Sequence, residues 1–311
     1  MKFEVTILGS RAAMPDIKHN QTAHALNVHE QFYLIDCGEA TQTQLMRYGI
    51  HPMRINHVFV SHLHGDHFYG LFPMISTMGL MGRKTPLHIY APRPLQEIVD
   101  MHFRYFDAEL GYQIVCHEFN HTQHQMIYDN KVMEVWTVPL RHRVPCAGFH
   151  FREKTPQLNL RPQMIERYGL TIQQMVAAKQ GEDIELESGE IIPNAQLTYT
   201  PYSPRSYAYL SDTTYSAKAV GLVKGVDLLY HEATYADAER KRAKQTGHST
   251  TLQAAKAAVE SEAKQLIIGH FSGRYDDNTE MLRAEAATLF PNTVAATEGL
   301  RVAIPIRKNT P

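Results

Sequence analysis

The chain has 311 residues, of which 43% are hydrophobic, and a formal net charge of −1. This length allows one large domain or two small ones, and the hydrophobic fraction is sufficient for a substantial core. Because the charge is nearly balanced, the chain as a whole does not attract nucleic acid, so any polyanion must bind a local patch or bound metal ions. No apolar run of about 18 residues occurs, so no membrane-spanning segment is expected.

The cysteines and the amino terminus both indicate the cellular compartment in which the protein is expected. Cys37, Cys116 and Cys146 form no CxxC pair and are odd in number, which favours reduced thiols over disulfides. The first residues read as a β-strand that contains an acidic residue, Glu4, rather than as a signal peptide. We therefore expect a cytoplasmic protein in which the cysteines are small buried hydrophobic residues.

The first elements along the chain are expected to be β-strands followed by a helix. Residues 3–8 predict a strand, and residues 23–29 and 31–35 predict a hairpin. Residues 40–48 predict a helix that ends at Gly49, since glycine commonly follows the last turn of a helix.

The segment from Ser61 to His67 then places three histidines and one aspartate in six consecutive positions. Residues 58–60 just before it predict the end of a buried strand, and the apolar residues from 68 onward predict the start of a helix. A strand that delivers polar side chains into a short turn is suited to holding a metal ion.

The spacing within this segment directs four side chains toward one volume. His62 and His64 are two positions apart and therefore project from the same side of the strand end. Gly65 is expected to let the backbone turn tightly, so that Asp66 and His67 face back toward that volume. Imidazole nitrogens together with a carboxylate suit zinc best, and manganese or iron less well.

Four more elements complete the first half of the chain. Residues 87–90 predict a strand, and residues 94–106 predict an amphipathic helix with a proline in its first turn. Further strands are expected at 112–119 and 132–140.

The segment from about 152 to 190 differs from its surroundings because it is rich in polar and charged residues. Two short helical patterns lie within it, at 162–168 and 171–179. We expect a single domain over residues 1–311 from which this segment protrudes as an arm. An ordinary pair of surface helices is the alternative interpretation.

The second half repeats the theme of a strand followed by a helix. Strands are expected at 206–210, 227–230 and 265–269, and an alanine-rich helix at 251–262 has Ser249-Thr250 available as its N-cap. Two such strand–helix halves favour a mixed α/β fold in which a sheet–sheet core is covered by helices.

Three later residues stand directly after apolar strands and complete a candidate metal site: His142, Asp212 and His270. With the earlier segment they form two ligand groups that share one carboxylate. We expect His62, His64 and His142 at one ion, Asp66, His67 and His270 at the other, and Asp212 between them.

The charge of such a site favours phosphodiester chemistry. Two divalent ions and two carboxylates leave about +2, because imidazole ligands are neutral, and a bridging hydroxide reduces this to about +1. That charge attracts a phosphodiester monoanion and offsets the extra charge of its transition state. Two metal ions also lower the pKa of bound water and clamp phosphoryl oxygens.

Hydrolysis with a poor leaving group also requires a proton donor. His248 is the candidate for protonating the leaving oxygen, with Glu232 orienting it and keeping it cationic. The alternative makes His248 a helix-end residue and Glu232 a surface acid. Ser272 and Arg274 offer a hydroxyl and a guanidinium for phosphate, although Arg274 alternatively forms a surface salt bridge.

Taken together, these segments resemble the metallo-β-lactamase superfamily and, within it, the short form of ribonuclease Z, the tRNA 3′-processing endonuclease. The resemblance extends over nearly the whole chain. The segments that carry it are 35–42, 61–67, 71–73, His142 with Gly148-Phe149, 211–213, 231–234, 248–250 and 270–275. The His-Glu-Ala-Thr segment at 231–234 and the segment from His270 to Tyr275 are the most specific of these.

The resemblance implies an αββα sandwich, two zinc ions, often a homodimer, and cleavage of tRNA precursors just after the discriminator base. It implies that Asp66 is a ligand that also assists proton removal from the attacking water. It further implies that His248 and Glu232 form a proton relay, and that Ser272 and Arg274 lie near phosphate.

Two departures from the family pattern leave the substrate open. The loop near the amino terminus that is basic in the family reads Pro15-Asp16-Ile17-Lys18-His19-Asn20 in this chain. His19 therefore stands where the family usually has an arginine, and Asp16 adds an acidic residue to the loop. The arm has no Gly-Pro motif between its helices and carries mixed charge. A phosphodiesterase of the same superfamily acting on small phosphodiesters or other RNA ends is therefore the alternative, and a metal-stabilised RNA-binding protein without turnover is a third hypothesis.

Overall fold

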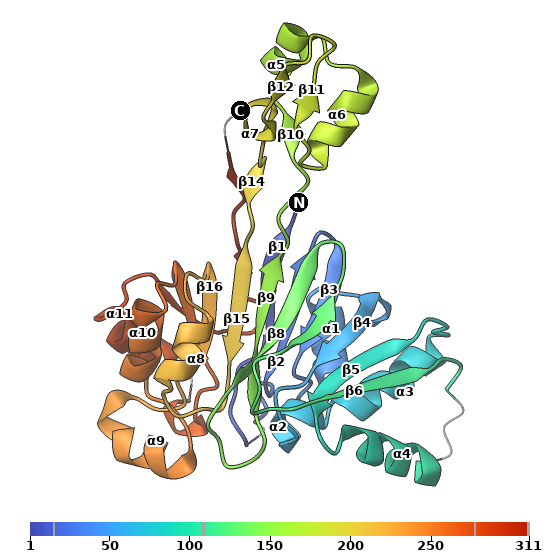
Figure 1. The fold of residues 1–311 in the computed structure, drawn as a ribbon. Coiled ribbons are helices and arrows are strands. Elements are labelled where there is room, and N and C mark those ends of the chain that lie inside the picture. The colour runs from blue at the N-terminus through green and yellow to red at the C-terminus, as the bar shows by residue number, and fades with distance from the viewer. Residues whose placement is uncertain (15, 107–109, 277, 310–311) are drawn as a thin grey trace. The chain divides into compact units, whose positions relative to one another are not determined.

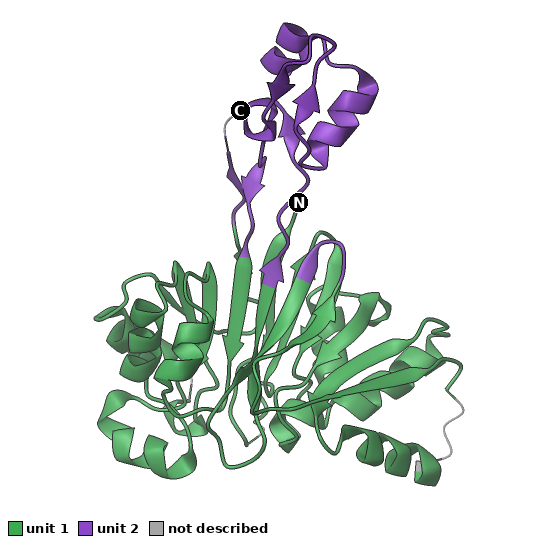
Figure 2. Cartoon of the chain, in the orientation of Figure 1, with its two compact units in different colours: residues 1–129, 134–151, 206–304 green, residues 130–133, 152–205, 305–311 purple. Residues whose placement is uncertain are grey.

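The computed structural model describes residues 1–14, 16–106, 110–276 and 278–309. Pro15, the first residue of the altered loop, lies outside the described residues. The chain divides into two compact units, which Figure 2 distinguishes by colour. Unit 1 comprises residues 1–129, 134–151 and 206–304, and unit 2 comprises residues 130–133, 152–205 and 305–311.

Unit 1 is built on two seven-stranded sheets. The first sheet is antiparallel on one side and parallel from β3 to β6. Its order is β19 (Arg301–Ala303), β1 (Phe3–Gly9), β2 (Ala23–Val28), β3 (Gln31–Ile35), β4 (Ile55–Phe59), β5 (Leu87–Pro92) and β6 (Ile114–Phe119). The parallel connections run through helices, as parallel strands require.

The second sheet is parallel from β15 to β18 and has β7 and β8 antiparallel at its other edge. Its order is β18 (Thr293–Ala295), β17 (Gln265–Gly269), β16 (Leu228–Glu232), β15 (Ser206–Leu210), β9 (Ala147–Glu153), β8 (Met133–Pro139) and β7 (Met126–Asp129). In the parallel part Leu210 stands beside His231, and Glu232 stands beside Gly269, so three strands end at one edge.

Helices cover the outer faces of both sheets, as Figure 1 shows. The first sheet is accompanied by α1 (Thr41–Arg47), η1 (Pro52–Arg54), α2 (Gly65–Phe68), α3 (Leu71–Leu80) and α4 (Leu95–Phe106). The second is accompanied by α8 (Ala217–Leu222), η2 (Asp237–Glu239), α9 (Arg240–Thr246), α10 (Thr251–Glu260), η3 (Gly273–Tyr275) and α11 (Thr279–Ala287). The expected layered α/β sandwich is therefore confirmed.

Three layers of apolar side chains hold these elements together. One buried cluster lies between the first sheet and its helices, and includes Leu34, Val58 and Met74. A second lies between the second sheet and α8, α10 and α11. Between the sheets, aromatic rings interlock: the Phe59 ring centroid is 5.3 Å from that of Phe151 in an edge-to-face contact.

Unit 2 has a small core of its own. It contains β10 (Asn159–Leu160), α5 (Pro162–Tyr168), α6 (Ile172–Lys179), β11 (Ile184–Glu185), β12 (Ile191–Ile192), α7 (Asn194–Leu197), β13 (Thr198–Tyr199), β14 (Tyr202–Ser203) and β20 (Arg307–Lys308). Both expected helices form, and Leu170, Ala178 and Leu197 pack together between them and the short strands. The unit extends to residue 205, beyond the expected boundary at 190. The role of this segment as an arm stays a prediction.

One expected helix begins later in the structure. The helix expected from residue 68 onward is α3, which begins at Leu71, and a separate short helix, α2, ends at Phe68 before it. Gly70 lies against the backbone of Gly38, where a Cβ on Gly70 would be 1.8 Å from the Gly38 carbonyl oxygen. The backbone N–H of Gly70 donates to the carbonyl of Cys37 at 2.9 Å. This contact between distant segments positions the start of α3.

Two other expectations can be compared with the structure. Cys37 and Cys146 are buried and Cys116 is half-buried, and all three are free thiols. Within the described parts of the chain, every helix is too short or too polar to span a bilayer.

Candidate metal centre

The predicted site residues meet where strands of both sheets end. His62 and His64 follow β4 of the first sheet, whereas Asp212 and His270 follow the parallel strands β15 and β17 of the second. Because parallel strands of one sheet end at the same edge, their following residues lie side by side. The site therefore joins the two sheets of unit 1.

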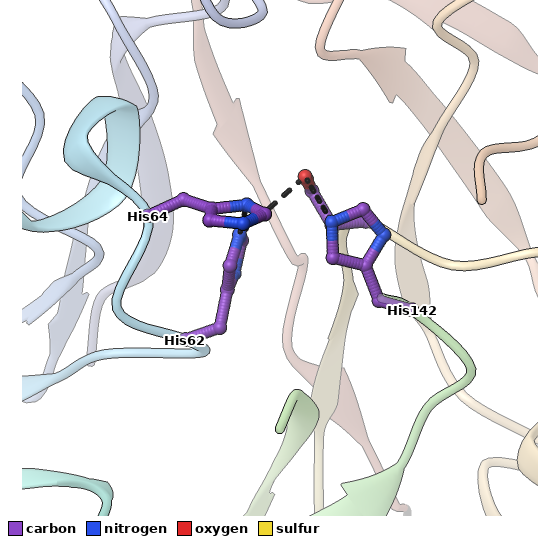
Figure 3. A group of neighbouring side chains, drawn as sticks. His62, His64 and His142 are labelled. Carbon is purple, nitrogen blue, oxygen red and sulfur yellow. Dashed lines mark hydrogen bonds and ion pairs between the residues drawn. The ribbon is translucent and has the colours of Figure 1, made fainter. Parts of the chain in front are cut away.

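The first ligand group consists of His62, His64, His142 and Asp212, whose donor atoms all lie within 4.8 Å of one another. Figure 3 shows the imidazole rings of His62 and His64 directed toward that of His142. His62 Nε2 lies 3.0 Å from His64 Nδ1 and 3.5 Å from Asp212 Oδ2. His142 Nε2 lies 3.7 Å from the same carboxylate oxygen.

The second ligand group consists of Asp66, His67 and His270. The Nε2 atoms of His67 and His270 are 3.2 Å apart. Asp66 Oδ2 lies 3.6 Å from the former and 3.5 Å from the latter. Asp212 reaches this group with its other oxygen, since Oδ1 is 3.3 Å from His67 Nε2 and 3.2 Å from His270 Nε2.

These spacings are those of ligands around an ion. In a tetrahedral site with metal–ligand bonds of about 2.0 Å, neighbouring donor atoms are about 3.3 Å apart. His142 supplies a further sign, because its Nδ1 lies 3.0 Å from the carbonyl oxygen of Gly247 while its buried Nε2 has no hydrogen-bond partner. A ring that donates from Nδ1 presents a lone pair on Nε2, as a metal ligand must.

The charge distribution also favours a cation. Burial lowers the pKa of His62, His64 and His142, which keeps these rings in the neutral form that binds metal. Burial opposes protonation of His67 as well, but the carboxylates of Asp212, Asp36 and Asp66 raise its pKa well above its usual value. The histidines and aspartates are therefore positioned to bind metal.

Asp36 is a further residue in contact with the site, and the sequence alone did not single it out. Its Oδ2 lies 2.7 Å from His67 Nδ1, and it accepts hydrogen bonds from the backbone N–H and the hydroxyl of Ser61. A carboxylate behind a ligating histidine fixes the ring and raises its basicity. Asp36 directly follows β3, as the predicted ligands follow their strands, and this position is the signal that the sequence offers.

Three residues of the site have left-handed backbone conformations. Asp36, Asp212 and His270 have φ values of 56°, 52° and 60°, a region that residues other than glycine seldom adopt. Such conformations cost free energy and persist where function requires them. Asp212 and His270 are thereby turned toward the ligands from the first sheet.

The expected role of Gly65 is wrong. Gly65 has a negative φ and begins α2, so Asp66 and His67 reach the site from the first turn of a short helix. A Cβ on Gly65 would be 2.6 Å from the ring of Tyr69, a contact that the exposed Tyr69 side chain can relieve by rotating.

Glu232 and His248 form a pair beside the ligands, in which Glu232 is buried and His248 is half-buried. His248 Nδ1 lies 2.9 Å from Glu232 Oε1, and the Glu232 side chain is 0% exposed, so it is not a surface acid. Glu232 also accepts hydrogen bonds from the backbone N–H groups of Thr213, Ser249 and Thr234. Burial opposes a charge on His248, but the Glu232 carboxylate and its hydrogen bond raise the His248 pKa to about 9.

A pocket of about 500 Å³ opens onto both ligand groups and onto His248. Ser272 and Arg274 line it, together with residues that the sequence did not single out, such as Met14, Arg143 and Tyr235. The Arg274 guanidinium is paired with Glu239, whose Oε2 is 3.3 Å from Nη1. The structure thus has Arg274 at the pocket and also in the salt bridge that was its alternative role.

The aspartate that departs from the family pattern has a structural role in its own loop. Asp16 Oδ1 accepts hydrogen bonds of 2.7 Å from the backbone N–H groups of Lys18 and His19. Its Oδ2 pairs with the nearly buried Arg11 at 3.1 Å. Asp16 therefore stabilises the turn of its own loop and pairs with a buried guanidinium.

Comparison with known proteins identifies relatives that match this chain over nearly its whole length. The family profile of the Anti-Pycsar protein Apyc1 matches residues 3–105. Ribonuclease Z of Bacteroides thetaiotaomicron is 45% identical over 303 residues, which cover 97% of this chain and 96% of that protein. Ribonuclease Z of Porphyromonas gingivalis is 39% identical over 300 residues, with 96% and 98% covered.

Solved structures agree with the sequence relatives. Human tRNase Z, short form, superposes with a TM-score of 0.71 at 28% identity and covers 97% of this chain and 99% of its own. A metallo-β-lactamase fold protein from Bacillus subtilis superposes with a TM-score of 0.69 at 18% identity, which supports the fold alone. The chain has the metallo-β-lactamase fold, and on its full-length identity to these relatives it belongs to the ribonuclease Z family.

Proposed function

We propose that this chain is a zinc-dependent endoribonuclease that removes the 3′ trailer from tRNA precursors. The observation that carries the proposal is the Glu232–His248 pair beside two ligand groups, in a chain that matches proteins named ribonuclease Z along its whole length. A metal site alone fits many hydrolases. A charged, half-buried histidine at the same pocket adds the proton donor that a phosphodiester with a poor leaving group requires.

In this proposal two zinc ions occupy the two ligand groups, with Asp212 between them, and Mn²⁺ or Fe²⁺ is the alternative. The donor set fits, because each group offers imidazole nitrogens and a carboxylate at the spacing of a tetrahedral shell. When bound, such ions lower the pKa of water and neutralise charge on the phosphoryl group.

The residues of the chain then move the protons. Water attacks phosphorus while Asp66, whose Oδ2 accepts a hydrogen bond from the Ala13 N–H at 2.7 Å, assists removal of its proton. The bond between phosphorus and the 3′ oxygen of the tRNA breaks, and His248 protonates that oxygen. Glu232 keeps His248 charged and fixes its ring. The products are a 3′-hydroxyl on the tRNA and a phosphate on the trailer.

The remaining expectations of substrate handling form part of the same proposal. Ser272 and Arg274 contact the phosphate, and Arg274 does so after leaving Glu239. The enzyme acts in the cytoplasm and as a homodimer.

The test is incubation of purified, zinc-loaded protein with a tRNA precursor that carries a 3′ trailer. A cut just after the discriminator base, with a 3′-hydroxyl on the tRNA, is the expected result. If the protein hydrolyses bis(p-nitrophenyl) phosphate but leaves the precursor intact, the alternative phosphodiesterase function is correct. Stoichiometric binding of the precursor without any hydrolysis would instead support the RNA-binding hypothesis.

A further inference from the structure

The helix α9 (Arg240–Thr246) carries an unusual density of positive charge for this chain. Its sequence places four cations within five positions: Arg240, Lys241, Arg242 and Lys244. All four side chains are exposed. The whole chain has a net charge of −1, so this density is a local feature and not the result of a basic composition.

Only part of this charge is neutralised by neighbours. Arg240 pairs with Asp237 at 2.9 Å, and Arg242 pairs with Glu239 at 2.9 Å. No carboxylate among the described residues forms an ion pair with Lys241 or Lys244. These two lysines are three positions apart and therefore lie on the same face of the helix.

The last turn of α9 is attached to the wall of the metal pocket. Arg143 Nη2 donates to the carbonyl of Gln245 at 2.6 Å, and His142, a predicted ligand, lies with Nδ1 3.0 Å from the carbonyl oxygen of Gly247. Thr246 and His248 line the pocket itself. Figure 1 shows α9 at the same edge of unit 1 as α2, which carries Asp66 and His67.

We propose that Lys241 and Lys244 form a phosphate-binding surface that holds the RNA backbone next to the scissile bond. The two lysines project from one face of α9, so both ammonium groups can contact the same RNA strand. Ammonium groups contact phosphates without reading bases, so the surface serves any tRNA sequence. This inference rests on the proposed function and adds a binding surface outside the pocket.

The phosphates come either from the paired stem on the tRNA side of the cut or from the single-stranded trailer. Both present the same anionic backbone, and the two sources differ in the length of RNA that each requires. Substrates with a one-nucleotide trailer and with a long trailer separate them.

The experiment measures kcat/KM for a tRNA precursor between 50 and 200 mM salt, with the zinc-loaded enzyme. Each lost phosphate contact reduces the slope of log(kcat/KM) against log[salt] by about 0.7 to 0.9. The double variant Lys241→Ala/Lys244→Ala is therefore expected to have a slope shallower by about 1.4 to 1.8. Over this salt range the wild type loses about 7- to 12-fold more activity than the variant.

The matched control removes two other exposed lysines, Lys224 and Lys256, which pair with Glu262 and Glu260. Lys224 precedes β16 and so lies at the opposite end of the strand from the site. Lys224→Ala/Lys256→Ala is expected to keep the wild-type slope, as is the charge-retaining Lys241→Arg/Lys244→Arg. If the slopes of wild type and Lys241→Ala/Lys244→Ala still differ with a one-nucleotide trailer, the bound phosphates belong to the stem. If the slopes differ only with a long trailer, the bound phosphates belong to the trailer.

Failure of this inference is separable from failure of the proposed function. If wild-type enzyme cuts the precursor and Lys241→Ala/Lys244→Ala has the same slope as the control, the surface does not bind RNA. A fall in bis(p-nitrophenyl) phosphate hydrolysis as large as the fall in precursor cleavage would also overturn it, because the change would then lie in the metal centre. If wild-type enzyme hydrolyses only the small phosphodiester, the proposed function fails instead.

Discussion

Asp212 has the most demanding position of any residue in the site. Its two carboxylate oxygens face different ligand groups, with Oδ2 toward His62 and His142 and Oδ1 toward His67 and His270. It adopts this orientation from a backbone with a φ of 52°. A longer glutamate or an amide at this position cannot reproduce both contacts and the charge, so the two groups depend on one side chain.

The ligand and proton-donor roles predict different results for two histidine variants. His64→Ala is expected to abolish hydrolysis by losing metal, because His64 Nδ1 belongs to the first ligand group. His248→Ala is expected to retain the metal content of the wild type and to slow turnover by roughly 10²–10⁴-fold, the usual contribution of a general acid. Elemental analysis of both proteins, beside their rates on bis(p-nitrophenyl) phosphate, checks this. Loss of metal from His248→Ala would make His248 a ligand and end the relay mechanism.

Among the elements, α3 depends on the close contact between Gly70 and Gly38. A Cβ on Gly70 would be 1.8 Å from the Gly38 carbonyl oxygen and 3.0 Å from that of Cys37. Both neighbours are backbone atoms and cannot rotate away. Since α2 and its ligands directly precede Gly70, the same contact also positions Asp66 and His67.

Gly70→Ala is therefore expected to destabilise the protein by about 3 kcal/mol or more, because the clash forces the backbone to shift. Gly221→Ala is the matched control, since Gly221 lies in α8 with negative φ and no heavy atom within 4 Å of its ideal Cβ. Alanine in a helix should stabilise there by about 0.5–1 kcal/mol. Urea denaturation of the two variants measures both values. Equal stabilities would show that the contact at Gly70 adjusts freely.

A second element-level feature is a row of histidines across the first sheet. His57, His88 and His117 stand on β4, β5 and β6, and their rings stack at 5.0 and 5.3 Å between centroids. Burial, with the neighbouring His88, His117 and Arg83, lowers the pKa of His57 to about 4. The folded protein therefore resists protonating this row.

The sign of the pH dependence follows from that direction. Between about pH 6.5 and 4 the unfolded chain binds a proton at His57 that the folded chain does not, so stability falls as pH falls through this window. From pH 7 to pH 5 we expect His57 to account for about 2 kcal/mol. Comparing wild type with His57→Phe by urea denaturation at both pH values isolates this contribution, because titration of the metal ligands is common to both. An identical pH dependence in the two proteins would contradict it.

At the scale of the whole molecule, local sequence patterns predicted most of the fold. They failed for features that depend on contacts between residues far apart in the sequence. Strand-end histidines and aspartates could be found because each follows an apolar run, and parallel strands bring such ends together. The break between α2 and α3 could not be predicted, because it depends on the contact of Gly70 with the backbone of Gly38. The two-residue strands of unit 2 are too short to show alternation, and the role of Asp36 depends on its contact with His67.

The candidate site contains residues from both sheets of unit 1, so metal bound there would contribute to the stability of the fold. His62 and His64 come from the first sheet, and Asp212 and His270 come from the second. A free metal concentration of 100 times the Kd should stabilise the folded state by about 2.7 kcal/mol. This raises the Tm by about 5–10 °C for a unit of this size. Thermal unfolding after chelation and after zinc is restored measures this shift. His64→Ala is expected to respond much less than wild type, and a wild-type Tm that zinc does not change would mean that the ligands do not hold the sheets together.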